Sequence, residues 1–168
     1  MKTDYYAKRR KRLADEMADM SFYFVYSGEA LESSLDETFL FEPYRNFIYL
    51  TGLESEKTLL LITKVKGKVT ERFFMHIPSE KERRWLGLAF DEEVIKEKTG
   101  INNILPLEDF EDVISRLMFN NDIRYMYIDE VRWRMSYPLK KEGLLANELL
   151  KTYPYLSCHN AFNILAKM

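Results

Sequence analysis

Residues 58–77 read TLLLITKVKGKVTERFFMHI, and this stretch decides the fold. Its first part, residues 58–62, is an unbroken apolar run and predicts a strand that is buried on both faces. Lys66-Gly67 then turns the chain into residues 69–77, where β-branched and aromatic side chains are frequent. Two such runs joined by a short glycine turn predict an antiparallel hairpin.

The residues before the hairpin predict one helix and two more strands. Apolar residues recur at helical spacing between charged ones over residues 4–20, which indicates an amphipathic helix. The aromatic run 22–26 predicts a buried strand, and residues 47–50 predict a second one that ends at Thr51-Gly52. Between them, residues 29–44 are acidic and aperiodic, and we expect a long surface loop with at most a helical turn.

The residues after the hairpin alternate between helical and strand patterns. Helices are expected from Asp91 to a terminating Gly100, over residues 107–118 and 139–150, and from Asn160 onward. Strands are expected over residues 101–105, 123–128 and 156–158. This alternation, together with the hairpin, predicts an α/β fold with a mixed β-sheet flanked by helices.

Length and charge bound the class of protein. A chain of 168 residues fits a single domain, 1–168. Its 25 basic and 27 acidic residues nearly cancel, and the pI of about 5.8 argues against nucleic-acid binding. The basic run 8–12 is expected to be a solvated helix face. No leader pattern and no apolar run of about 20 residues is present, so we expect a cytoplasmic protein without a membrane partner.

The residues that usually carry chemistry are sparse. His76 and His159 each lack a second ligand at metal-binding spacing, and Cys158 is expected to be a buried thiol in a reducing compartment. The acidic groups 91–93, 108–109 and 111–112 each precede or begin a predicted helix, where they favour the positive end of its dipole. The sequence therefore predicts no catalytic residue and no metal site in this chain.

Three motifs resemble a known family. Residues 45–53, RNFIYLTGL, followed by the apolar run 59–62, resemble the Tyr-Leu-Thr-Gly signature and next strand of X-Pro aminopeptidase N-terminal domains. Tyr6, Arg9, Arg10 and Leu13 are similar to the family's opening Phe/Tyr-x-x-Arg-Arg-x-x-Leu helix. Trp85-Leu86-Gly87 is similar to its Trp-x-Gly element. The chain thus resembles the N-terminal domain of aminopeptidase P, in the creatinase/prolidase superfamily.

The resemblance implies a mixed sheet of the creatinase/prolidase N-terminal type, which is ribonuclease H-like. It also implies a C-terminal pita-bread catalytic domain, absent from this chain, that holds two divalent cations, expected to be manganese. The partners implied are that catalytic domain, further copies in a homo-oligomer, and short proline-containing peptides. The N-terminal domain would shape substrate access and supply subunit contacts.

The substrate-access candidates that the resemblance implies are Trp85, Gly87, Tyr49 and Arg45. Trp85 either packs on a peptide or covers its own core, and Tyr49 is either an access residue or an ordinary sheet residue. Leu88 stands where the family usually has arginine, and residues 41–45 also depart from its pattern. Two alternatives therefore stay open: a non-catalytic peptide- or protein-binding module of the same family, and an enzyme with creatinase or prolidase specificity.

Overall fold

The predicted hairpin is present at the centre of the computed structural model, which describes residues 2–30, 32–34, 37–38, 41–77, 79–81, 84, 92–130 and 139–168. Strands β4 and β5 pair antiparallel from Leu59↔Phe74 to Val65↔Lys68. They belong to a six-stranded sheet whose spatial order is β6 (Ile104–Pro106), β5 (Lys68–Met75), β4 (Leu59–Val65), β1 (Ser21–Tyr26), β7 (Tyr125–Ile128) and β8 (Ser157–Asn160). The β5–β6, β1–β7 and β7–β8 pairs are parallel, so the sheet is mixed as predicted.

Side-chain alternation along the strands divides the core into two clusters, one on each face of the sheet. In β1, Tyr23 and Val25 belong to one cluster, whereas Phe22 and Phe24 belong to the other. All six residues of β1 are buried, because both of its faces are covered. Residues 59–62 of β4 are buried in the same way, which confirms the prediction from their apolar run.

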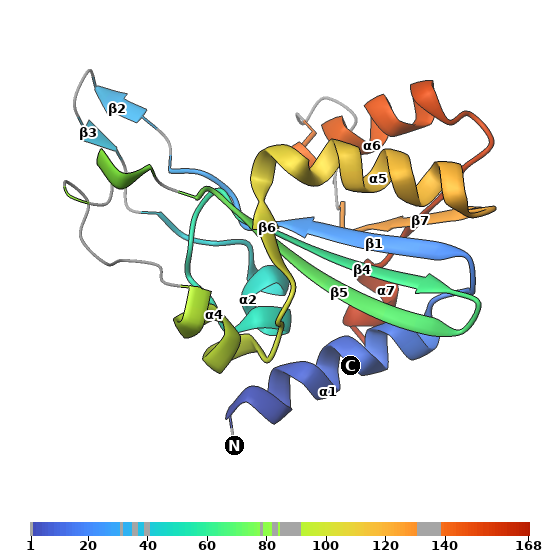
Figure 1. Cartoon of the computed structure of the whole chain (residues 1–168), viewed down its shortest axis with the longest axis horizontal. Helices are drawn as coiled ribbons and strands as arrows, with labels where there is room; N and C mark the ends of the chain where they lie inside the picture. Colours follow the sequence, from blue (N-terminus) through green and yellow to red (C-terminus); the bar gives the residue numbers. More distant parts are fainter. Residues whose placement is uncertain are drawn as a thin grey trace.

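Helices cover both faces of the sheet, which gives three layers (Figure 1). One face carries α1 (Lys2–Glu16), α2 (Arg45–Thr51), α4 (Glu92–Thr99) and α7 (Phe162–Leu165). The other face carries α5 (Phe110–Asn120), which follows the 3-10 turn η1 (Leu107–Asp109), and α6 (Lys141–Thr152). The expected α/β fold, a mixed β-sheet flanked by helices, is therefore confirmed.

The strand predicted over residues 47–50 is wrong, because these residues form helix α2. Phe47, Leu50 and Thr51 are buried, and their spacing of three and four residues is that of one helix face. Four apolar residues alone cannot distinguish a strand from a buried helical turn. Gly52 ends the helix in the left-handed region with φ 72°, and its N–H donates to the carbonyl of Ile48.

Two other differences concern α1 and the segment after β1. Helix α1 ends at Glu16, four residues before the predicted end, and Met20 has a φ of 56° where the chain turns into β1. The predicted surface loop over residues 29–44 contains a short antiparallel pair, β2 (Glu32–Ser34) and β3 (Glu37–Thr38). The described residues of this segment thus include a two-stranded sheet of their own.

The long connections all start at one end of the sheet. The pairs Tyr26↔Leu59 and Leu59↔Phe74 place the end of β1, the start of β4 and the end of β5 side by side. Because β7 is parallel to β1, its last residue, Ile128, lies at that end as well. The connections after β1, β5 and β7 therefore begin at the same end of the sheet, the end to which the β1 arrow points in Figure 1.

Candidate functional site

Two of the motifs noted in the sequence meet in space and form one structural joint between α1 and α2. The Arg9 guanidinium donates to the carbonyl of Tyr49 (2.9 Å), and the Arg10 guanidinium donates to the carbonyl of Leu50 (2.9 Å). These carbonyls lie in the last turn of α2, where no further helical N–H reaches them. Gly52 lies against the ring of Tyr6. The spacing of both motifs is therefore explained by packing.

Arg10 corrects the prediction that residues 8–12 form a solvated face. Its side chain is buried, donates also to the carbonyl of Thr99 (2.7 Å), and pairs with Glu71 at 3.0 Å. Burial lowers the pKa of the guanidinium, and Glu71 opposes that shift. Lys8, Lys11 and Arg12 are exposed, as predicted.

Only two of the four substrate-access candidates, Arg45 and Tyr49, lie among the described residues. Trp85 and Gly87 lie outside the described residues. Tyr49 faces α1, with the Arg9 guanidinium 3.7 Å from its ring centroid, so the interpretation of Tyr49 as a sheet residue is wrong. Arg45 is exposed at the first position of α2. Neither Arg45 nor Tyr49 lines the cleft that is described next.

A cleft of about 1140 Å³ lies at the sheet end from which the long connections leave. Its lining includes Tyr26 at the end of β1 and Glu29 after it, Tyr44 before α2, and Lys140, Lys141 and Glu142 at the start of α6. That volume is sufficient for a short peptide segment or a small organic molecule. Most of the exposed lining is apolar, with hydroxyl, carboxylate and ammonium groups set into it, so the cleft suits a ligand that has an apolar part and a polar or charged group.

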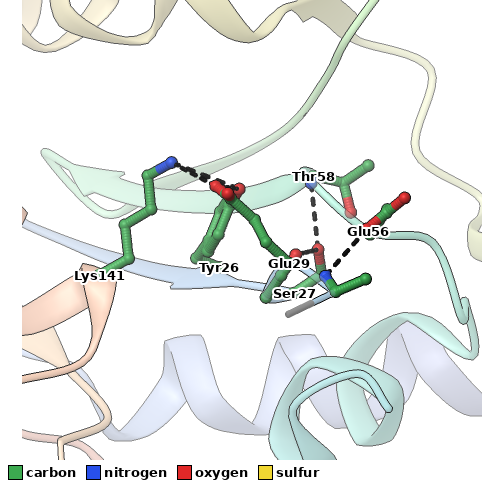
Figure 2. Close-up of polar contacts among 8 residues, drawn as sticks. Tyr26, Ser27, Glu29, Glu56, Thr58 and Lys141 are labelled. Atoms are coloured by element: carbon green, nitrogen blue, oxygen red, sulfur yellow. Dashed lines mark hydrogen bonds and ion pairs between the residues drawn. The ribbon is translucent and has the colours of Figure 1, made fainter. Parts of the chain in front are cut away.

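One wall of the cleft is fixed by a hydrogen-bond network (Figure 2). The Lys141 ammonium donates to Glu29 (2.8 Å) and to the Tyr26 hydroxyl (3.3 Å), and the Tyr26 hydroxyl donates to Glu29. Lys141 and Tyr26 hold Glu29 ionised and lower its pKa, whereas burial and Glu29 raise the pKa of Tyr26. Nearby, Ser27 exchanges hydrogen bonds with Thr58, which ties the end of β1 to the start of β4.

A second polar group, which we call the acid cluster, lies behind this wall and consists of Asp129, Glu130 and Glu142. Asp129 is fully buried directly after β7, where it accepts hydrogen bonds from Asn46 and Tyr44. Glu142 is buried at the start of α6 and accepts the backbone N–H of Tyr26 at 2.9 Å. A methyl group added at Gly143 would lie 2.9 Å from Glu130 Oε2, so Glu130 packs closely against the start of α6.

Burial dominates the electrostatics of the acid cluster. Loss of hydration raises the pKa of Asp129, although Asn46, Tyr44 and Lys140 oppose the shift. Loss of hydration also raises the pKa of Glu142. Desolvation, together with the negative charges of Asp129 and Glu142, raises the pKa of the fully buried Tyr23 hydroxyl well above its usual value. The cluster is thus a region of negative potential beside the cleft.

The sequence predicted neither the cleft nor the acid cluster. Their members come from positions 26 to 151 and meet because β1 and β7 are parallel neighbours in the sheet. The available signal was the pair Asp129-Glu130 directly after a predicted strand, since ligands of open α/β sheets often bind at the carboxyl ends of strands.

The two histidines, the cysteine and the acidic pairs noted in the sequence lie in or beside strands and helices, away from the cleft lining. His159 is exposed in β8, its Nε2 lies 2.9 Å from Ser157 Oγ, and its ring packs against Tyr127. His76 is exposed just after β5. The predicted burial of Cys158 is wrong, because this residue is exposed in the edge strand β8. Glu92 and Glu93 lie in the first turn of α4, and residues 108–109 and 111–112 begin η1 and α5, as predicted.

The described residues do not present a metal-binding donor set. Among them, no three His, Cys, Asp or Glu side chains converge in a way that could hold a metal ion. A pair of divalent cations would therefore not fit the described part of this chain. Likewise, no helix within the described ranges is both long and apolar enough to cross a bilayer.

The six-stranded mixed sheet with helices on both faces defines an α/β domain of the type seen in the N-terminal part of aminopeptidase P structures. Residues 6–127 match the family described as aminopeptidase P, N-terminal domain. The chain belongs to this family. A comparison with curated proteins found no match.

Solved structures of aminopeptidases share this fold. A putative aminopeptidase P from Bacillus anthracis superposes with a TM-score of 0.91 at 24% identity, over 99% of this chain and 40% of that chain. Proline aminopeptidase P II from Yersinia pestis gives a TM-score of 0.73 at 18% identity, over 98% and 38%. Zn-substituted E. coli aminopeptidase P in complex with product gives 0.71 at 16% identity, over 94% and 36%. The present chain thus spans about two fifths of the length of these structures.

Proposed function

We propose that this chain is the N-terminal accessory domain, 1–168, of a dimetal Xaa-Pro aminopeptidase in the cytoplasm. It shapes substrate access and supplies contacts in a homo-oligomer, while a C-terminal catalytic domain, its direct partner, hydrolyses short proline-containing peptides. The two divalent cations, which we expect to be manganese, belong to that domain and would supply a metal-activated hydroxide. Membership of the family carries this proposal.

The common origin of the long connections supports a role in access. The connection that contains Trp85 and Gly87 leaves β5 at Met75, at the same sheet end as the cleft. Arg45 follows Tyr44, a residue of the cleft wall, and is solvent-exposed. Loops that leave one end of a rigid sheet are well placed to border a neighbouring active site. Tyr49 is engaged by Arg9 and is a weaker candidate for contact with substrate.

A variant in the full-length protein tests the access role. We expect Trp85→Ala to lower kcat/KM for an Xaa-Pro peptide about tenfold or more, because loss of an aromatic contact removes about 1–2 kcal/mol of binding. The Tm should stay within about 2 °C. Phe119→Ala is the matched control, since Phe119 is 91% exposed at the far end of α5. Unchanged kinetics with a lowered Tm would instead assign Trp85 to the core.

A non-catalytic binding module is the second candidate. The cleft favours it, because this chain itself offers a cavity of about 1140 Å³, with a largely apolar lining and several charged groups, that could hold a peptide segment. The downstream sequence separates the two functions: an intact set of metal ligands supports the enzyme, and their loss supports the module. The 168-residue chain with added manganese should not hydrolyse an Xaa-Pro peptide. Turnover by this chain alone would contradict both candidates.

A further inference from the structure

The acid cluster contains buried oxygens that no described group satisfies. Asp129 Oδ1, both carboxylate oxygens of Glu130 and the Tyr23 hydroxyl are buried and have no hydrogen-bond partner among the described residues. Buried polar atoms are normally paired, because each unpaired one loses its hydration without compensation. The unpaired atoms of Asp129 and Glu130 are acceptors, so the group that is missing is a donor.

The charges around the acid cluster do not balance. Three carboxyl groups, Asp129, Glu130 and Glu142, face one described ammonium group, Lys140, which acts on Asp129 and Glu142. The neighbouring Lys141 is already paired with Glu29 at 2.8 Å. Buried charges are usually paired or neutralised. The group that completes the cluster therefore needs a positive charge as well as N–H donors.

We infer that the acid cluster is a recognition site for an organic cation, a guanidinium or ammonium group, that enters from the cleft. Glu142, a member of the cluster, and Tyr44, which donates a hydrogen bond to Asp129, both line the cleft, so they form the entrance to the cluster. The Tyr44 ring already accepts a cation, since the Lys140 ammonium lies 3.7 Å from its centroid. A planar guanidinium carries five N–H donors in fixed directions and can satisfy several separate carboxylate oxygens at once.

This site is separate from the proposed peptidase role. It uses residues at the carboxyl ends of β1 and β7 and at the start of α6, and neither Trp85 nor a metal ion takes part. An organic cation also suits the geometry better than a metal ion, because the described carboxylates are not grouped for coordination. The inference can therefore fail while the accessory-domain function holds, and the reverse is equally possible.

A ligand titration of the isotope-labelled 168-residue chain tests the inference. Ethylguanidinium and n-butylammonium chloride are added at pH 7 and constant ionic strength, and amide shifts are followed by NMR. Saturable shifts of the Tyr26 amide, which donates to Glu142, are expected at millimolar concentrations. Ethylurea, which has the shape of ethylguanidinium without its charge, should not reproduce them. A stronger response to one of the two cations identifies the preferred class.

Variants connect binding to the cluster. Asp129→Asn and Glu130→Gln keep the size of each side chain and remove its charge, and each should weaken binding at least about tenfold, or about 1.4 kcal/mol. Glu148→Gln is the matched control, because Glu148 lines the same cleft on α6 but is 70% exposed and paired with Lys151. Its affinity should be unchanged.

Three outcomes would overturn the inference. The first is an equal response to ethylurea and ethylguanidinium. The second is equal weakening by Glu148→Gln and Asp129→Asn, which would indicate nonspecific attraction to the acidic surface. The third is binding that occurs only after Arg132 or Arg134 is replaced by glutamine. That result would mean that an arginine of the unaltered chain supplies the cation. If either cluster variant fails to fold, the comparison of ethylurea with ethylguanidinium on the unaltered chain still decides.

Discussion

Gly52 and Gly67 share a backbone conformation but have different surroundings, which makes them a matched pair. Their φ angles are 72° and 75°, in the left-handed region that other residues adopt at a cost. A Cβ at Gly52 would lie 2.3 Å from the Tyr6 ring, whereas a Cβ at Gly67 would meet nothing within 4 Å. The glycine of the Tyr-Leu-Thr-Gly motif is thus required by both its φ angle and the close approach of α1.

We expect Gly67→Ala to cost about 1 kcal/mol of unfolding free energy, which is the backbone penalty alone. Gly52→Ala should cost about 2 kcal/mol more, because Tyr6 must also move. Chemical denaturation of both variants measures the difference. In a Tyr6→Ala background the additional cost of Gly52→Ala should largely disappear. Equal losses of unfolding free energy for the two alanine variants would show that Tyr6 can move aside without a measurable cost.

Arg10 acts at the scale of elements, because one side chain links four of them. It starts in α1 and reaches the carbonyl of Leu50 in α2, the carbonyl of Thr99 in α4 and the carboxylate of Glu71 in β5. We expect Arg10→Met to destabilise the chain by about 3–5 kcal/mol, as for other broken buried ion pairs. Arg12→Met is the control, since Arg12 is exposed and should cost under about 1 kcal/mol. A loss for Arg10→Met no larger than that for Arg12→Met would contradict this role.

The elements also show what the sequence could and could not predict. Long periodic segments such as α1 and α5, and the apolar strands β1 and β4, have a local cause and were predicted. Helix α2 was not, because its seven residues are selected by contacts from α1, 40 positions away. Arg10 was missed for the same reason: helical periodicity alone does not indicate which member of a basic run is buried. The acid cluster depends on the pairing of β1 with β7, which no local pattern specifies.

At the scale of the whole molecule, packing on the two faces of the sheet provides stability. The cleft and the acid cluster lie at one end of the sheet, where β1 and β7 end. A cluster of buried apolar side chains lies on each face. Of the buried charged residues in the described ranges, Arg10 pairs with Glu71, whereas Asp129 and Glu142 both lie near the ends of β1 and β7. Buried charged side chains lower the free energy of unfolding, and such residues are expected at positions that bind a ligand.

The cost of burying Asp129 and Glu142 should be visible in the pH dependence of the unfolding free energy. The pKa of Asp129 is raised in the folded chain, so the folded state binds more protons than the unfolded state above about pH 4, the ordinary pKa of aspartate. Stability contributed by protonated Asp129 is complete at low pH and is lost as the pH rises through the folded pKa. Glu142, with a raised pKa, adds a loss of the same sign, while Lys140 moderates both.

Asp129→Asn keeps an acceptor for Asn46 and removes the buried charge. Relative to the unaltered chain, we expect its unfolding free energy to rise by about 1–2 kcal/mol at pH 7, which raises Tm by roughly 3–6 °C. The difference should shrink as the pH is lowered toward 4, because Asp129 takes up a proton as the pH falls through its raised pKa. Thermal unfolding followed by circular dichroism from pH 4 to pH 8 measures the trend, with Glu148→Gln as the exposed control. A Tm gain that is the same at both pH values, or a loss at pH 7, would show that Asp129 is stabilised as an anion by the groups around it.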